Sequence, residues 1–211
     1  TQTAASYRDF FVWRFARLME QNPFAALYYD VSRPVSTNNV LGGGGARKDG
    51  RLMMTESLLG CRNIVKRLYH MVKSRYPDGI IKYHMSGQPN MGFLAFCDAM
   101  VDGENTASLL RSNEQDPRTY RGLMTPAIYR AEYMGHNFGA VSDWLPQFTR
   151  HGGWDYESLA TPEGVAACDQ ILGLTLLHDA SLWKAYMTPL SYERMREALR
   201  RHNWGSKYKM I

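Results

Sequence analysis

The sequence is poor in cysteine and has no long hydrophobic run. Its three cysteines, Cys61, Cys97 and Cys168, are odd in number and widely separated, and their spacing fits neither a metal knuckle nor a disulfide framework. Each lies among apolar neighbours, which is typical of buried free thiols. No segment approaches the roughly 18 apolar residues of a membrane-spanning helix. The composition therefore predicts a soluble chain with no membrane partner.

Blocks of one charge sign are also absent. Lys and Arg number 25 against 20 Asp and Glu, a formal net charge of +5, but the basic residues are spread over helix-like stretches, where they predict a solvated face. No nucleic-acid-binding motif is found, so no nucleic-acid partner is expected. No strand is followed by a GxGxxG or GxxxxGK[ST] loop, so no cofactor is predicted. The four glycines at 42–45 lack the Lys-Ser/Thr pair, and we interpret 36–51 as a mobile loop that lies over any ligand.

What the sequence does contain is a regular alternation of helical and strand-like segments. Its 211 residues are 45% hydrophobic, enough for a sizeable core in one α/β domain over 1–211. Thr125-Pro126 and Thr161-Pro162 are strong helix starts. Periodicity and turn residues predict helices over 5–21, 52–75, 89–96 (short), 125–136, 161–179 and 190–202, and strands over 24–32, 79–87, 98–104 and 139–148, with a loop over 105–120. Strands this apolar, separated by helices, are typical of a parallel sheet covered by helices.

Two architectures fit this order: an open doubly wound sheet, or part of a (β/α)8 TIM-type barrel. Polar side chains end every predicted strand, and in a barrel those strand ends build the active site. We therefore favour a barrel to which this chain contributes about four β/α units, the C-terminal half, plus terminal helices. The first residue is Thr1 rather than Met. Unpaired strand edges are an aggregation hazard, so we expect self-association or a covalent N-terminal half.

The segment "CDAMVDGEN" at 97–105 ends a predicted strand on two acids. If the strand continues, Asp102 and Glu104 leave it on the same face, because side chains alternate with period two. Two readings stay open: a solvated turn, or an acid/base pair with Glu104 as acid and Asp102 as partner. Asp30 is a third catalytic candidate, with a loop N-cap as its alternative.

Other strand-end side chains are candidates for substrate binding. They are Tyr29, His84, Ser86, Asp143 and Trp144. For each there is an ordinary structural alternative: a core aromatic, a structural histidine or a turn residue. A metal site on His84, Asp102 and Glu104 is a weaker reading, because no second histidine stands at ligand spacing.

Four segments carry a resemblance to a known group: "LYYDVSRP", "KYHMSGQPNMGFLAFCDAMVDGEN", "YRAEYMGHNFGAVSDWLPQF" and "LLHDASLW". With these the chain resembles bacterial glycoside-hydrolase-like barrels that neighbour glycoside hydrolase family 123, the β-N-acetylgalactosaminidases. The resemblance implies a glycosidase that degrades a polysaccharide or other glycan without a cofactor, and it favours a secreted or periplasmic location. It also implies substrate-assisted hydrolysis by an adjacent Asp and Glu, whereas here Gly103 separates Asp102 from Glu104. A non-catalytic glycan-binding or scaffold fragment and a metal-dependent hydrolase remain as alternatives.

Overall fold

The computed structural model describes residues 4–30, 32, 34–85, 90–104, 121–133, 139–145, 159–183 and 187–202. The chain divides into two compact units. Unit 1 comprises Thr1–Val101 with Phe138–Ala140, and unit 2 comprises Asp102–Asn137 with Val141–Ile211.

The central feature is a five-stranded sheet with the strand order β1-β6-β7-β8-β9. Its strands are β1 (Ala26–Tyr29), β6 (Ile80–His84), β7 (Ala99–Asp102), β8 (Val141–Trp144) and β9 (Ser181–Leu182). β1 pairs with β6, β6 with β7 and β8 with β9, each in parallel. The predicted α/β class and its four strands are confirmed, while the two-residue β9 was not predicted. No closed barrel is seen among the residues described.

The helices begin and end close to the predicted positions. They are α1 (Ala5–Gln21), α2 (Leu58–Arg75), α3 (Met91–Leu94), α6 (Pro126–Tyr133), α8 (Pro162–Leu177) and α9 (Pro189–Arg201). Both Thr-Pro starts are confirmed, because each threonine hydroxyl accepts a backbone N–H of the first turn, Thr125 from Ile128 and Thr161 from Gly164. The prediction for 52–75 was wrong at its start, since α2 begins only at Leu58. The predicted loop at 105–120 lies outside the described residues.

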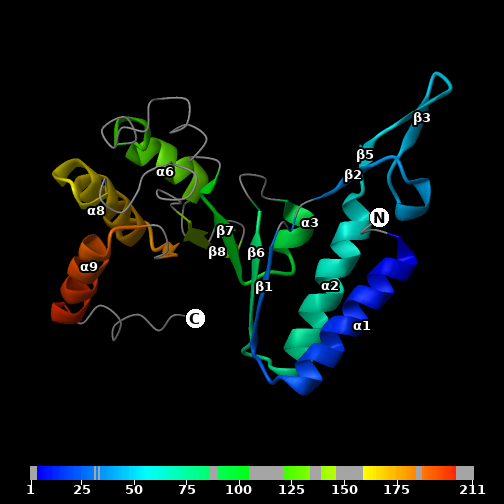
Figure 1. Ribbon diagram of the computed structural model, residues 1–211, viewed down its shortest axis with the longest axis horizontal. Helices are drawn as coiled ribbons and strands as arrows, with labels where there is room; N and C mark the ends of the chain where they lie inside the picture. Colours follow the sequence, from blue (N-terminus) through cyan, green and yellow to red (C-terminus); the bar gives the residue numbers. More distant parts are fainter. Residues whose placement is uncertain are drawn as a thin grey trace. The chain divides into compact units, whose positions relative to one another are not determined.

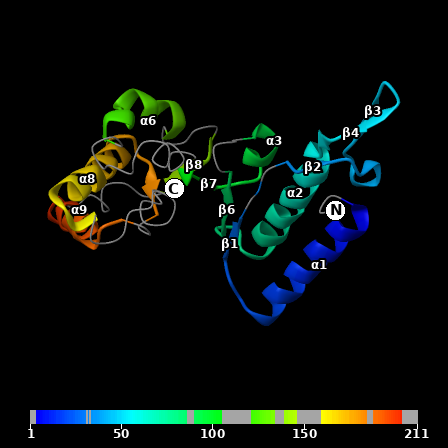
Figure 2. The same ribbon diagram turned by 45° about the horizontal axis from the view of Figure 1, so that its top comes forward.

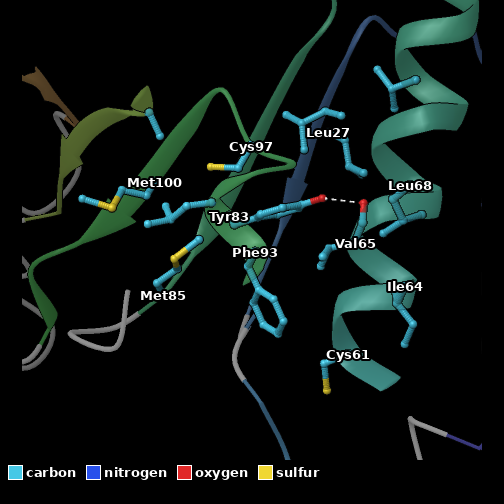
Figure 3. Close-up of a cluster of buried hydrophobic side chains, with 14 of the residues drawn as sticks. Leu27, Cys61, Ile64, Val65, Leu68, Tyr83, Met85, Phe93, Cys97 and Met100 are labelled. Carbon is cyan, nitrogen blue, oxygen red and sulfur yellow. Dashed lines mark hydrogen bonds between the residues drawn. The ribbon is translucent and has the colours of Figure 1, made fainter. Parts of the chain in front are cut away.

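In unit 1, α1 and α2 run side by side in both views (Figures 1 and 2). Leu27, Ile81 and Tyr83 of the sheet are buried in one apolar cluster with Ile64, Val65, Leu68 and Val72 of α2. The Tyr83 hydroxyl donates to the Val65 carbonyl at 3.0 Å, so its one polar atom is satisfied inside the cluster (Figure 3). The helices thus cover one face of β1 and β6, which leaves the alternate side chains on the other face.

The glycine-rich segment 36–51 was predicted as a loop, and together with 52–56 it contains two short antiparallel strand pairs. β2 (Ser36–Thr37) pairs with β5 (Thr55–Glu56), and β3 (Ala46–Lys48) pairs with β4 (Arg51–Met53), both antiparallel; the 3-10 turn η1 (Val40–Gly42) lies between. A Cβ on Gly44 would lie 2.3 Å from Cγ2 of Thr37. Gly45 has φ +84, and a Cβ there would lie 2.7 Å from the Asn38 carbonyl oxygen. Gly44 thus allows the backbone to pack closely on Thr37, and Gly45 adopts a left-handed backbone conformation that other residues rarely adopt.

All three thiols are buried, as the sequence predicted. Burial raises the pKa of Cys97 to about 12 and that of Cys168 to about 11, and it also raises the pKa of Cys61. The thiolate is the reactive form, so native protein at pH 8 should react with an aromatic disulfide reagent roughly 100-fold or more slowly than free cysteine. Unfolding in denaturant should release all 3 thiols. Rapid labelling of even one thiol in the folded protein would contradict this burial.

Candidate functional site

Three side chains of unit 1 meet at the carboxyl ends of β1 and β6, and we call Tyr28, Asp30 and His84 the strand-end cluster. The Tyr28 hydroxyl oxygen lies 2.6 Å from Nδ1 of His84 and 3.2 Å from Oδ1 of Asp30. The same Asp30 oxygen lies 2.9 Å from His84 Nδ1. Three groups able to exchange protons therefore lie within hydrogen-bonding distance of one another.

Strand alternation and parallel register build this cluster. In β1, Leu27 and Tyr29 face the helices, so Tyr28 lies on the opposite face. The register places Tyr28 opposite Lys82, and His84 follows two residues later on the same face of β6. Asp30 comes directly after the end of β1.

A further contact fixes the backbone beside the cluster. Both the backbone N–H and the hydroxyl of Ser32 donate to the His84 carbonyl oxygen, each at 3.0 Å. The chain that follows Asp30 is thereby tied to the end of β6. Ser32 is buried, which shields these bonds from competing water.

The members of the cluster differ sharply in exposure. The His84 side chain is 5% exposed, while that of Asp30 is 64% exposed, and Tyr28 is 40% exposed. A buried imidazole is thus held beside two groups that solvent can reach. Such an arrangement is suited to moving a proton between the interior and a bound ligand.

Tyr29, predicted as a substrate-binding residue, lies on the helix side of the sheet. Its ring is 5.9 Å from Phe11 and 6.0 Å from Tyr83, centroid to centroid, and burial raises the pKa of its hydroxyl to about 12. Tyr28 is the tyrosine that reaches the cluster. The sequence prediction selected Tyr29 and not Tyr28, since two adjacent aromatic residues give no signal of which one faces the helices. Ser86, the candidate that follows β6 two residues after His84, lies outside the described residues.

At the end of β7 the predicted acid pair lies around a tight turn of unit 2. Asp102 is 3% exposed, and its Oδ1 accepts the Gly103 backbone N–H at 2.7 Å. β7 ends at Asp102, and Gly103 has φ +126. The period-two argument that placed Glu104 on the face of Asp102 therefore fails, because the extended backbone stops one residue too early. Glu104 itself is half-buried.

At the end of β8, Asp143 and Trp144 are both buried. The Trp144 ring lies 5.8 Å from that of Tyr129 within the apolar core of unit 2. Such packing leaves no open indole face on which a sugar would stack. By alternation Asp143 points to the opposite side of the strand. The two candidates of β8 are thus divided between the two faces of the sheet.

His178 of the "LLHDASLW" segment lies where α6 meets α8. Its Nδ1 is 2.7 Å from the Leu174 carbonyl oxygen, and its Nε2 accepts from Nε of Arg130 at 2.9 Å. Its ring is also 5.2 Å from that of Tyr129. These contacts give His178 a structural role between the two helices.

None of the helices described is long and apolar enough to span a bilayer. No group of three or more His, Cys, Asp or Glu side chains suited to a metal ion occurs in the described part of the chain. Compared with known protein families, with curated proteins and with solved structures, the chain matches none of them.

Proposed function

We propose that this chain is part of a glycosidase-like hydrolase that acts on a glycan at the carboxyl ends of its parallel strands. The strand order supports this architecture. Strands β1, β6, β7, β8 and β9 follow one another in the sheet as they do in the sequence, whereas doubly wound sheets reverse direction at a switch point. A sheet that proceeds in one direction is typical of a (β/α)8 barrel, of which this chain would be the C-terminal half. The resemblance to glycoside-hydrolase-like barrels points the same way.

The observation that carries the proposal is the pairing of Asp30 with His84 at 2.9 Å at adjacent parallel-strand ends. Ligands of parallel α/β proteins bind at this end of the strands. Glycoside hydrolysis needs one group that protonates the departing oxygen and a second that supplies a base, a nucleophile or a charge partner. In our proposal the Asp30–His84 pair of unit 1 supplies one of these groups. Glu104 of unit 2, with Asp102 as its partner, is the acid of the acid/base reading from the sequence, and it is tested separately.

The test is sugar release by the polypeptide that contains this chain, from a panel of aryl glycosides and natural glycans. Asp30→Asn should lower kcat by roughly 10²–10³-fold, because it removes the charge that holds His84 in its basic role. Asp49→Asn is the matched control. Asp49 is exposed in the β3–β4 turn with φ 51, which asparagine also adopts, so turnover should not change. Glycan binding without sugar release would instead favour the non-catalytic alternative.

A further inference from the structure

We propose that Tyr28, His84 and Asp30 form one proton-sharing unit, in which the Tyr28 hydroxyl exchanges a proton with the ligand and His84 Nδ1 takes it up. Only the identity of the ligand rests on the function proposed above. The sharing of the proton is a property of the free protein and can be tested without any substrate.

Two partners share one ring nitrogen of His84. Both the Tyr28 hydroxyl, at 2.6 Å, and the Asp30 carboxylate, at 2.9 Å, lie against Nδ1 of His84. When Nδ1 carries no proton, its lone pair accepts the Tyr28 O–H. When Nδ1 is protonated, it donates to Asp30, and the Tyr28 O–H turns to the same carboxylate, 3.2 Å away. The three side chains thus provide hydrogen bonds for both protonation states.

Of these side chains, Tyr28 connects buried His84 to the surface. The His84 side chain is too deeply buried to touch a ligand, whereas Tyr28 is substantially exposed and lies at hydrogen-bonding distance from it. The phenolic oxygen therefore links Nδ1 to the surface. In the Ser-His-Asp arrangement the nucleophile and the carboxylate use different ring nitrogens. Here both use Nδ1, so Asp30 directly stabilises the proton that Tyr28 delivers.

A ligand hydroxyl or water loses a proton to the Tyr28 oxygen while the original Tyr28 proton moves to Nδ1. Tyr28 ends neutral and His84 becomes an imidazolium paired with Asp30. The resulting hydroxide or alkoxide bonds to the anomeric carbon as the glycosidic C–O bond breaks, and the departing oxygen takes its proton from a general acid. Afterwards the imidazolium returns its proton through Tyr28 to solvent, and the general acid regains a proton from solvent. Tyr28 is thus the catalytic residue that contacts the ligand, and His84 and Asp30 are positioning residues.

Lys82 is a further charged residue on the face of the sheet that carries Tyr28 and His84. It is the only one besides the cluster among the described residues of β1, β6 and β7 up to Val101. It lies opposite Tyr28 and two residues before His84. Asp98 belongs to a separate contact, in which it accepts from Lys73 at 2.9 Å and from the Ile81 N–H at 2.8 Å. Lys82 is present in every variant compared below, so its charge does not affect the comparison.

The first experiment follows the His84 ring by ¹⁵N and ¹H NMR through a pH titration of the free protein. Tyr28→Phe removes the donor that stabilises neutral His84, so the pH midpoint of its protonation should rise. Asp30→Asn removes the partner of the imidazolium, so the midpoint should fall. Tyr7→Phe on α1, where Tyr7 stacks on Phe11, is the control and should leave the midpoint unchanged. Midpoints that move in the same direction, or that do not move, overturn the proposal.

The second experiment measures the pH dependence of kcat and of kcat/KM for sugar release. Tyr28→Phe should lower kcat roughly 10²-fold or more with little change in KM, since it removes proton transfer and leaves the packing intact. Wild-type turnover by Tyr28→Phe would overturn the catalytic role of Tyr28. If the intact enzyme releases no sugar while the two midpoints move in opposite directions, the glycosidase proposal fails and the proton-sharing unit stands.

Discussion

Gly103→Ala is expected to destabilise unit 2 by about 3–5 kcal/mol, in the range of the most damaging single substitutions. A Cβ at this position would lie 2.4 Å from the carbonyl oxygen of Leu145 and 3.1 Å from its nitrogen. The backbone also has φ +126, which alanine rarely adopts. Neither contact is with a flexible side chain, so the backbone itself has to move. That movement breaks the hydrogen bond from the Leu145 N–H to the Asp102 carbonyl, now 2.8 Å.

The measurement is denaturant unfolding followed by tryptophan fluorescence, since Trp144 lies in the core of unit 2. Gly173→Ala is the matched control, because Gly173 lies inside α8 with nothing within 4 Å of the added methyl. There alanine should leave stability unchanged or raise it by up to about 1 kcal/mol, as expected for a helix interior. Equal unfolding midpoints for Gly103→Ala and wild type would show that the turn after β7 has room for a side chain.

The parts of the fold that the sequence predicted well are those that local signals control. α1 has the predicted bounds, and both Thr-Pro helix starts lie where the cap residues indicated. The β3–β4 hairpin was missed although its Asp49-Gly50 turn, with φ 51 and 75, is a local hairpin signal. The β2–β5 pairing has no such signal, because it joins segments that are not adjacent in the sequence, with Gly44 in close contact with Thr37. β9 was missed for a similar reason: a two-residue strand exists through its pairing with β8.

The candidate site likewise contains residues that a general rule selected from the sequence and residues that only their packing identifies. The rule that polar side chains gather at the carboxyl ends of parallel strands selected Asp30 and His84, and the structure brings these two together. The prediction chose Tyr29 over Tyr28, because both are aromatic residues of β1 and only the packing of Phe11 on Tyr29 distinguishes them. The prediction that Asp102 and Glu104 share one face was wrong, because strand alternation requires an extended backbone at Gly103, whose φ is +126.

Glu104→Gln is the change from which we expect the largest loss of activity. In the acid/base reading of Asp102 and Glu104, which both belong to unit 2, Glu104 protonates the departing glycosidic oxygen. Glutamine keeps nearly the same shape but has no acidic proton. Turnover of a natural glycan should fall by roughly 10²–10⁴-fold, the usual contribution of a general acid, while binding of the glycan remains. An aryl glycoside with a good leaving group should be affected much less, because its departing oxygen needs little protonation.

The comparison of these two substrates is what distinguishes acid catalysis from damage to the fold, since a misfolded variant would lose both activities equally. Glu193→Gln provides a carboxylate control on the surface of α9, where Glu193 bridges to Arg196 at 2.9 Å in an i,i+3 pair. Exposed pairs of this kind contribute little to stability, so both activities should stay at the wild-type level. If Glu104→Gln retains wild-type turnover on the natural glycan as well as on the aryl glycoside, the proton comes from another group and the half-buried acid after β7 is part of a turn.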